Sequence, residues 1–204
     1  MKIILADLNK RESHELLLSA ILPRPIALVS TVGEDGVFNV APFSCFAPAG
    51  IKPALVCLQI GWKRDGQKKD TLKNIEFSKD FVVNVVDETL AKAMHEASTE
   101  YPSDVDEFKE VGLTALKSDL FKAPRVAESP VNMECKLVRI WEFGEVSTGG
   151  HLIIGEVMLV HIKDELWAVD KIDIYKLKVI GRLGGDFYCR TRDMFEMGKK
   201  TNPE

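Results

Sequence analysis

The segment from Lys63 to Lys73 carries the residue types that can hold a phosphate group. It contains five cations (Lys63, Arg64, Lys68, Lys69 and Lys73) against two acids, Asp65 and Asp70. A helix is expected to begin near Asp70, which places the Thr71 hydroxyl in the first turn, beside N–H groups that have no partner within the helix. Such a turn can bind a single phosphate. A solvated basic loop with Asp70 as an ordinary N-cap is the alternative that the local sequence leaves open.

A second unusual segment is Asn39-Val40-Ala41-Pro42-Phe43-Ser44-Cys45-Phe46. Pro42 lacks the N–H that a central strand would use, so we expect an interrupted strand or a sheet edge here. The backbone groups freed by the interruption could bind a flat heteroaromatic ligand. A β-bulge without any ligand is the competing interpretation.

Other catalytic patterns fail on spacing. The glycine-rich Gly181–Gly185 lacks the dinucleotide-binding pattern, and Gly61–Gly66 is followed by Gln67 and Lys68 where a P-loop has Lys and then Ser or Thr. His151 and His161 would lie roughly 33 Å apart on a straight strand and could not share a metal ion. The four cysteines form no CxxC, and no Gly-x-Ser-x-Gly occurs. We therefore expect neither a metal site nor hydrolase chemistry.

Composition narrows the class of protein. The 204 residues include 27 Lys and Arg against 31 Asp and Glu, a net charge of −4 that argues against general nucleic-acid binding. No apolar run approaches the roughly 20 residues that span a bilayer, and the first residues lack a signal-peptide cleavage site. The sequence predicts a cytoplasmic protein with no membrane segment, organised as a single domain over residues 1–204.

Strand patterns dominate the chain. We expect a hairpin of Ile26–Val32 and Val37–Phe43 around a turn at Gly33–Gly36. Further strands are expected at 54–60, at 81–86, from Asn132 and at 151–162, and the last carries Gly155, a mid-strand glycine that often marks a bulge or a close approach. Helices inserted between strands, rather than alternating with them, favour a β-barrel over a wound parallel sheet.

Two helical segments flank these strands. Residues 9–20 predict a helix capped near Asn9, with Leu16 and Leu17 facing inward. Residues 87–111 contain eight acids and two lysines around apolar residues at helical spacing. This pattern predicts an amphipathic helix with a solvated acidic face, and an acidic docking surface is the alternative.

Several sequence motifs together resemble those of the flavin reductase-like, FMN-binding split-barrel family. They are Arg24-Pro25-Ile26-Ala27-Leu28-Val29-Ser30-Thr31-Val32, the segment 39–46, Lys69-Asp70-Thr71 with Asn74, residues 81–86, 134–137 and 151–157, and a tail 181–188 typical of its flavoredoxin-like branch. They cover about residues 21–195 in the family's order. The resemblance implies a mainly β fold with inserted helices, a six-stranded split β-barrel that dimerises and holds FMN in a groove between subunits.

The resemblance also assigns site residues. It implies that FMN is bound by Ser30, Thr31, Asn39, Ala41, Pro42, Phe43, Ser44, Cys45, Phe46, Lys69, Asp70, Thr71, Asn74, His151, Arg182 and Tyr188. The Lys69-Asp70-Thr71 turn would take the phosphate. His151 and Arg182 would lie near the cofactor with electrostatic roles, and no protein acid or nucleophile would be catalytic because the flavin carries the chemistry.

The function implied is an FMN-dependent oxidoreductase of the NAD(P)H:flavin reductase type. Its electron donor would be NAD(P)H, and its partners would be a second copy of the chain and a redox protein or monooxygenase. A flavoredoxin-type electron carrier without NAD(P)H activity is one alternative. A split-barrel binding module that lacks flavin is the other.

Overall fold

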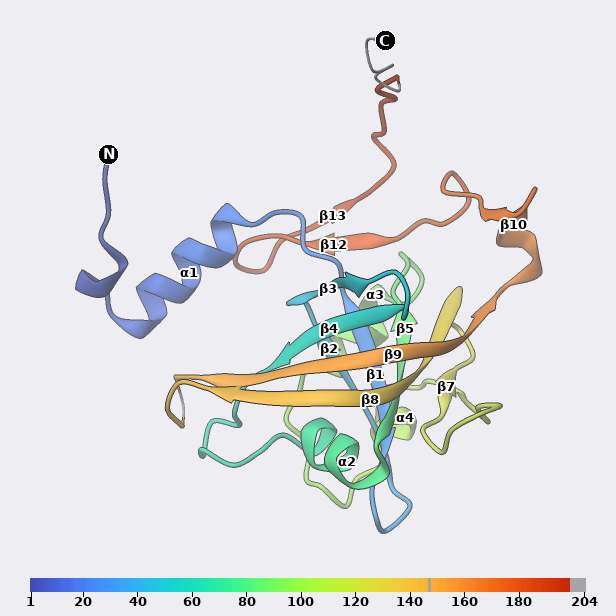
Figure 1. Cartoon of the computed structure of the whole chain (residues 1–204), viewed down its shortest axis with the longest axis horizontal. Helices are drawn as coiled ribbons and strands as arrows, with labels where there is room; N and C mark the ends of the chain where they lie inside the picture. Colours follow the sequence, from blue (N-terminus) through green and yellow to red (C-terminus); the bar gives the residue numbers. More distant parts are fainter. Residues whose placement is uncertain (147, 199–204) are drawn as a thin grey trace.

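The computed structural model describes residues 1–146 and 148–198, and its centre is one antiparallel sheet of seven strands (Figure 1). In spatial order these are β2 (Phe38–Phe43), β1 (Ala27–Val32), β5 (Asp80–Val85), β8 (Val131–Phe143), β9 (Gly150–Ile162), β4 (Leu55–Ile60) and β3 (Phe46–Gly50). Strand β2 also lies against β4, so the sheet curls back on itself. The expectation of a mainly β fold with inserted helices is confirmed.

The expected hairpin forms β1 and β2, with Ala27 opposite Phe43 and Val32 opposite Phe38. Strand β2 is an edge strand, so the missing N–H of Pro42 costs no ladder hydrogen bond in the sheet interior. After β2 the chain bends at Ser44 and Cys45 and continues as β3, which pairs with β4. This bend yields a seventh strand where the resemblance implied six.

Within the described residues, four α-helices accompany the sheet: α1 (Lys10–Ala20), α2 (Asp70–Ser78), α3 (Ala91–Glu96) and α4 (Glu107–Glu110). Helix α2 buries Leu72 and Ile75 in a core that contains Phe81. Met94 of α3 and Phe108 of α4 belong to a second core. The strongly apolar β1 is buried along its whole length, with Val29 in the first core and Leu28 in the second.

Helix α1 begins where the sequence predicts, but it buries nothing. Asn9 caps it, since the Asn9 side chain accepts from the Glu12 N–H while the Glu12 carboxylate accepts from the Asn9 N–H. The prediction that Leu16 and Leu17 face inward is wrong: Leu17 is 52% exposed. The helix extends away from the sheet in Figure 1, so its apolar side has no core to enter.

The acidic region 87–111 is likewise not one helix with a solvated face. It forms the two short helices α3 and α4, separated by turns at Ser98–Asp106. Glu107 is only 7% exposed, because the neighbouring Phe108 enters the core and carries the start of α4 against β2. The single-helix prediction failed because the apolar spacing continues across a break in the backbone.

Strands β8 and β9 form a long hairpin, and Gly155 lies where they are tightly packed. A Cβ on Gly155 would overlap the ring of Phe81, and the β8–β9 register shifts beside it between Leu137 and Arg139. Gly155 thus serves close packing between strands. The remaining elements are η1 (Leu5–Asp7), β6 (Ala115–Leu116), β7 (Arg125–Val126), η2 (Asp164–Leu166), β10 (Trp167–Ala168), β11 (Lys171–Ile172), β12 (Ile180–Arg182) and β13 (Tyr188–Arg190). None of the helices in the described residues has the length and hydropathy needed to cross a bilayer.

Candidate functional site

A small cavity of about 90 Å³ lies at the N-terminus of α2. Its walls bring together seven of the predicted site residues, namely Asn39, Ala41, Pro42, Phe43, Lys69, Asp70 and Thr71. Lys69 is the N-cap of α2, rather than Asp70, and its side chain makes no capping bond. The basic turn, the edge strand β2 and the first N–H groups of a helix therefore meet at one place, which suits an anion.

The cations at this cavity are paired with carboxylates. Lys63 Nζ lies 2.7 Å from Asp70 Oδ2, and Lys69 Nζ lies 3.2 Å from Glu100 Oε1. Burial alone would raise the pKa of Asp70, but the hydrogen bonds from Lys63, Ser103 and Lys73 outweigh it and hold the pKa below its usual value. The lysines are therefore fixed in place beside the cavity.

Thr71 does not lie on an exposed turn. It is 1% exposed, and its hydroxyl donates to Asn39 Oδ1 at 2.8 Å. The Thr31 hydroxyl donates to the same oxygen at 3.2 Å and accepts from Asn74 Nδ2 at 3.0 Å. The predicted residues Thr31, Asn39, Thr71 and Asn74 thus form one hydrogen-bonded network that joins β1, β2 and α2.

Glu107 completes this network, although nothing in its local sequence indicates such a role. Its Oε2 accepts both from Asn39 Nδ2 and, at 2.7 Å, from the Val40 N–H. Burial raises the pKa of Glu107 to about 7 in spite of these two donors, and the charge of Asp70 adds to the rise. In the sequence Glu107 is one acid in a run of eight, so residue type and spacing could not single it out.

A larger cavity of about 800 Å³ adjoins the small one and shares Pro42, Phe43 and Ser98 with it. The predicted residues Pro42, Phe43, Ser44, Cys45, Arg182 and Tyr188 line it. The Arg182 guanidinium lies over the Tyr188 ring, 4.5 Å from its centroid. The volume is within the range of small-molecule sites, and its walls mix aromatic, polar and cationic groups.

Arg24 holds three walls of this larger cavity together. Its side chain is buried and donates to Leu18 O at the end of α1, to Leu183 O at 3.1 Å and to Ser44 Oγ at 3.4 Å. Ser44 is a predicted site residue, whereas no role at the site is predicted for Arg24. Its Arg-Pro context after a helix was the one signal available.

Five predicted site residues line neither cavity: Thr31 and Asn74, which belong to the hydrogen-bonded network above, and Ser30, Phe46 and His151. Ser30 is buried, donates to Pro124 O and accepts from Asn84 Nδ2 at 2.9 Å. Phe46 packs against the core that contains Phe81. His151 is 1% exposed, with its ring 4.7 Å from that of Trp62. The structure therefore does not bring Ser30, Phe46 and His151 to the walls of either cavity.

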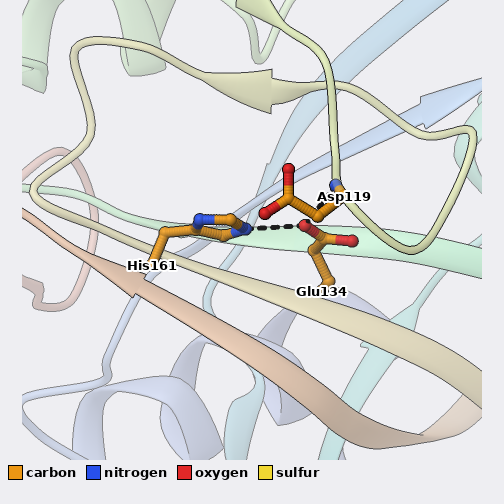
Figure 2. Close-up of side chains that lie close together, drawn as sticks. All are labelled: Asp119, Glu134 and His161. Carbon is orange, nitrogen blue, oxygen red and sulfur yellow. Dashed lines mark hydrogen bonds and ion pairs between the residues drawn. The ribbon is translucent and has the colours of Figure 1, made fainter.

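Asp119, Glu134 and His161 form a polar cluster (Figure 2), and none of the three lines either cavity. His161 Nε2 is 2.6 Å from Glu134 Oε1, a direct hydrogen bond that is shorter than the roughly 3.3 Å between two donor atoms around a tetrahedral zinc ion. Both Glu134 oxygens also accept backbone N–H groups, from Asp119 and Leu120 at 2.8 Å. Burial would raise the pKa of Glu134, yet these donors and His161 hold it below its usual value. The cluster fastens the loop around Asp119 to β8.

Comparison with known families gives a match over most of the chain. The model described as "Flavin reductase like domain" matches residues 18–171, which include the edge strand, the basic turn and the β8–β9 hairpin. The Arg182–Tyr188 wall of the larger cavity lies beyond the matched range.

Solved structures resemble the whole chain. Nitrilotriacetate monooxygenase component B from Bacillus cereus superposes with a TM-score of 0.92 and 32% identity, over 97% of this chain and 98% of that one. The 2-nitrobenzoate 2-nitroreductase NbaA from Pseudomonas fluorescens gives 0.89 and 31%, over 98% and 97%. Flavoredoxin of Desulfovibrio vulgaris, at 0.75 and 20% over 87% and 91%, shares the fold. The expected split-barrel fold is thereby confirmed.

Proposed function

This chain belongs to the flavin reductase-like family, and we propose that it binds FMN and acts as an NAD(P)H:flavin oxidoreductase. Bound FMN would accept hydride from NAD(P)H at its N5 atom, and this chemistry belongs to the cofactor. The chain's own residues supply binding, orientation and charge. No side chain is needed as a nucleophile or as a catalytic acid.

The observation that carries the proposal is the pair of adjoining cavities. The small one has Lys63 and Lys69 beside the N-terminus of α2, which suits the phosphate. The larger one has the volume and the mixed walls that suit a flat ring system. Phe43 lines both, so a ligand with a phosphate at one end and a ring at the other would lie along β2.

Within the larger cavity Arg182 is the residue suited to stabilise negative charge. It is the cation that stacks on Tyr188, and its side chain is about one-quarter exposed. Reduced flavin tends to carry negative charge at N1 and O2. A fixed cation close to such charge stabilises it as an oxyanion site does. Ser44 and Cys45 add the backbone groups of the bend between β2 and β3.

We also propose a homodimer in which a second copy completes the cofactor groove. Strand β8 leaves Val138 and Trp141 each 53% exposed, and α1 has an uncovered apolar side. We take these exposed apolar side chains as the candidate interface, since contiguous exposed apolar patches mark interaction sites. A monooxygenase or another redox protein would take up the electrons, in line with the name of the Bacillus cereus relative.

Purification of the protein followed by a kinetic assay tests the proposed FMN binding and NAD(P)H oxidation. The protein should be yellow or become so with FMN, the released cofactor should be FMN, and NAD(P)H should be oxidised when free FMN is added. A flavin-bound protein that does not oxidise NAD(P)H would instead favour an electron carrier of the flavoredoxin type, a protein with the same fold. A colourless protein that ignores FMN would leave only the binding module.

A further inference from the structure

Glu107 carries a buried carboxyl group at the end of the proposed FMN site that would hold the phosphate. It lies between two cavities. It lines the small cavity together with Lys63, Lys69 and Thr71. On its other side it lines a third cavity, of about 430 Å³, between the β1–β2 turn and α2. Its charge is therefore close to any phosphate that enters beside Thr71.

Its bonding pattern shows how it acts on the site. One oxygen, Oε2, accepts from Asn39 Nδ2 and from the Val40 N–H. Asn39 in turn offers its amide oxygen to the Thr71 hydroxyl. Because an amide that donates at one end must present its oxygen at the other, Glu107 fixes the orientation of Asn39 and, through it, that of Thr71.

We propose that Glu107 is a positioning residue for the flavin phosphate, and that FMN binds tightly only when the Glu107 carboxyl carries a proton. This inference rests on the proposed FMN site. An ionised carboxyl and a phosphate in adjoining positions repel each other, and more strongly where the carboxyl is buried, as Glu107 is. A protonated carboxyl keeps its accepting oxygen for Asn39 and Val40, so the network survives the loss of charge.

The surroundings make this proton exchange possible near neutral pH. Burial raises the pKa of Glu107 to about 7. The charged groups that share its cavities are Lys63, Lys69, Asp70, Glu100, Lys73, Glu34 and Asp35, together with Tyr101 as a titratable group. Lys63 and Lys69 are already bridged to acids, so they only partly offset the Glu107 charge.

Glu107→Gln separates this role from a merely structural one. Both donors use a single oxygen of Glu107, so the amide oxygen of glutamine can keep both bonds while the charge is lost. Glu110→Gln is the matched control, an exposed acid on the same short helix α4. Each protein is freed of flavin and titrated with FMN and with riboflavin, which lacks the phosphate, at about pH 6.5 and about pH 8.5.

For the wild type and Glu110→Gln we expect FMN affinity to fall about tenfold or more at the higher pH, while riboflavin affinity stays constant. For Glu107→Gln the FMN affinity should hold or rise slightly, since the phosphate itself gains charge with a pKa of about 6. An equal fall in the FMN affinity of Glu107→Gln would overturn the inference. A wild-type FMN affinity that does not change with pH would overturn it as well. A wild type that binds neither flavin would instead overturn the proposed function, and this inference with it.

A measurement on the wild type alone guards against a variant that does not fold. Calorimetric titration with FMN near pH 8, in buffers of different ionisation enthalpy, should show uptake of about one proton per FMN bound. Riboflavin should show none. An FMN titration without proton uptake would overturn the inference whether or not Glu107→Gln folds.

Discussion

The Thr71 hydroxyl donates to the amide oxygen of Asn39 at 2.8 Å, across 32 residues of sequence. This bond ties the first turn of α2 to the edge strand β2. It makes Thr71 part of the fold as well as part of the proposed phosphate site. Substitutions at this end of the groove should therefore divide into those that affect stability and those that affect only the ligand.

Thr71→Ala should lower both stability and FMN affinity. It removes a buried hydrogen bond and leaves Asn39 with one donor fewer, which costs about 1–2 kcal/mol of unfolding free energy. FMN affinity should fall about tenfold. Thr71→Ser, which keeps the hydroxyl, is the control and should stay close to wild type in denaturant unfolding and in FMN titration. Full stability in Thr71→Ala would contradict the burial argument.

Lys69→Ala should affect only the ligand. The Lys69 side chain is partly exposed and forms an ion pair with Glu100, so its loss should leave the melting temperature within about a degree or two. Loss of a charge-assisted bond to the phosphate should lower the affinity for FMN about ten- to hundredfold and leave the affinity for riboflavin unchanged. Lys92→Ala, at an exposed position on α3, is the control in the same titrations. Equal losses for both flavins would mean that Lys69 shapes the cavity without gripping the phosphate.

Arg24→Ala should lower the binding affinities for FMN and riboflavin equally. Arg24 joins the end of α1, Ser44 and Leu183 around the larger cavity, well away from the phosphate turn. Its loss should cost about 2–4 kcal/mol of stability, because a buried side chain that joins three segments is removed and part-buried carbonyl groups lose their donor.

Arg24→Lys is the informative companion substitution. A single ammonium group cannot reproduce the geometry of the guanidinium fork, so lysine should restore little of the stability or of the flavin affinity. Thermal unfolding and the two flavin titrations measure both effects. A loss of affinity for FMN but not for riboflavin would contradict the assignment of Arg24 to the end of the site that would hold the ring system.

Glu107 should make the flavin-free protein less stable as pH rises. Its folded-state pKa of about 7 lies above the ordinary value of 4.5, so the folded state keeps a proton that the unfolded state releases. The unfolding free energy should therefore fall between about pH 4.5 and about pH 7, by on the order of 3 kcal/mol at most. Glu107→Gln should lack this component of the pH dependence, as measured by urea unfolding. The same slope in wild type and variant would exclude Glu107 as its source.

Trp141→Glu should disrupt the proposed homodimer. A charge in an apolar interface loses its hydration without gaining a partner, so the dimer should dissociate at micromolar concentration. Light scattering and sedimentation report the mass, and FMN affinity should fall with it because the partner completes the groove. Val169→Glu, at a 91% exposed position beside β11, is the control. A wild-type monomer that still binds flavin would refute the dimer.

Several features of the fold were predictable from local sequence. The alternation and turn residues of the β1–β2 hairpin, the capping box of Asn9 and the start of α2 near Asp70 are each determined by neighbouring residues, and the structure contains them. Pro42 marked an edge strand because a missing N–H is a local property. The basic turn was likewise visible as a cluster of residue types.

The tertiary structure alone decided which polar groups meet. Glu107 and Asn39 are 68 residues apart, and Arg24 and Leu183 are 159 apart. No periodicity encodes such contacts, since they arise only when the sheet brings distant segments together. The same holds for burial: Leu17 follows a helical pattern yet finds no core, while Glu107 belongs to an acidic run yet is enclosed. Local sequence sets the backbone's preferences, but the desolvation that tunes a carboxyl depends on everything packed around it.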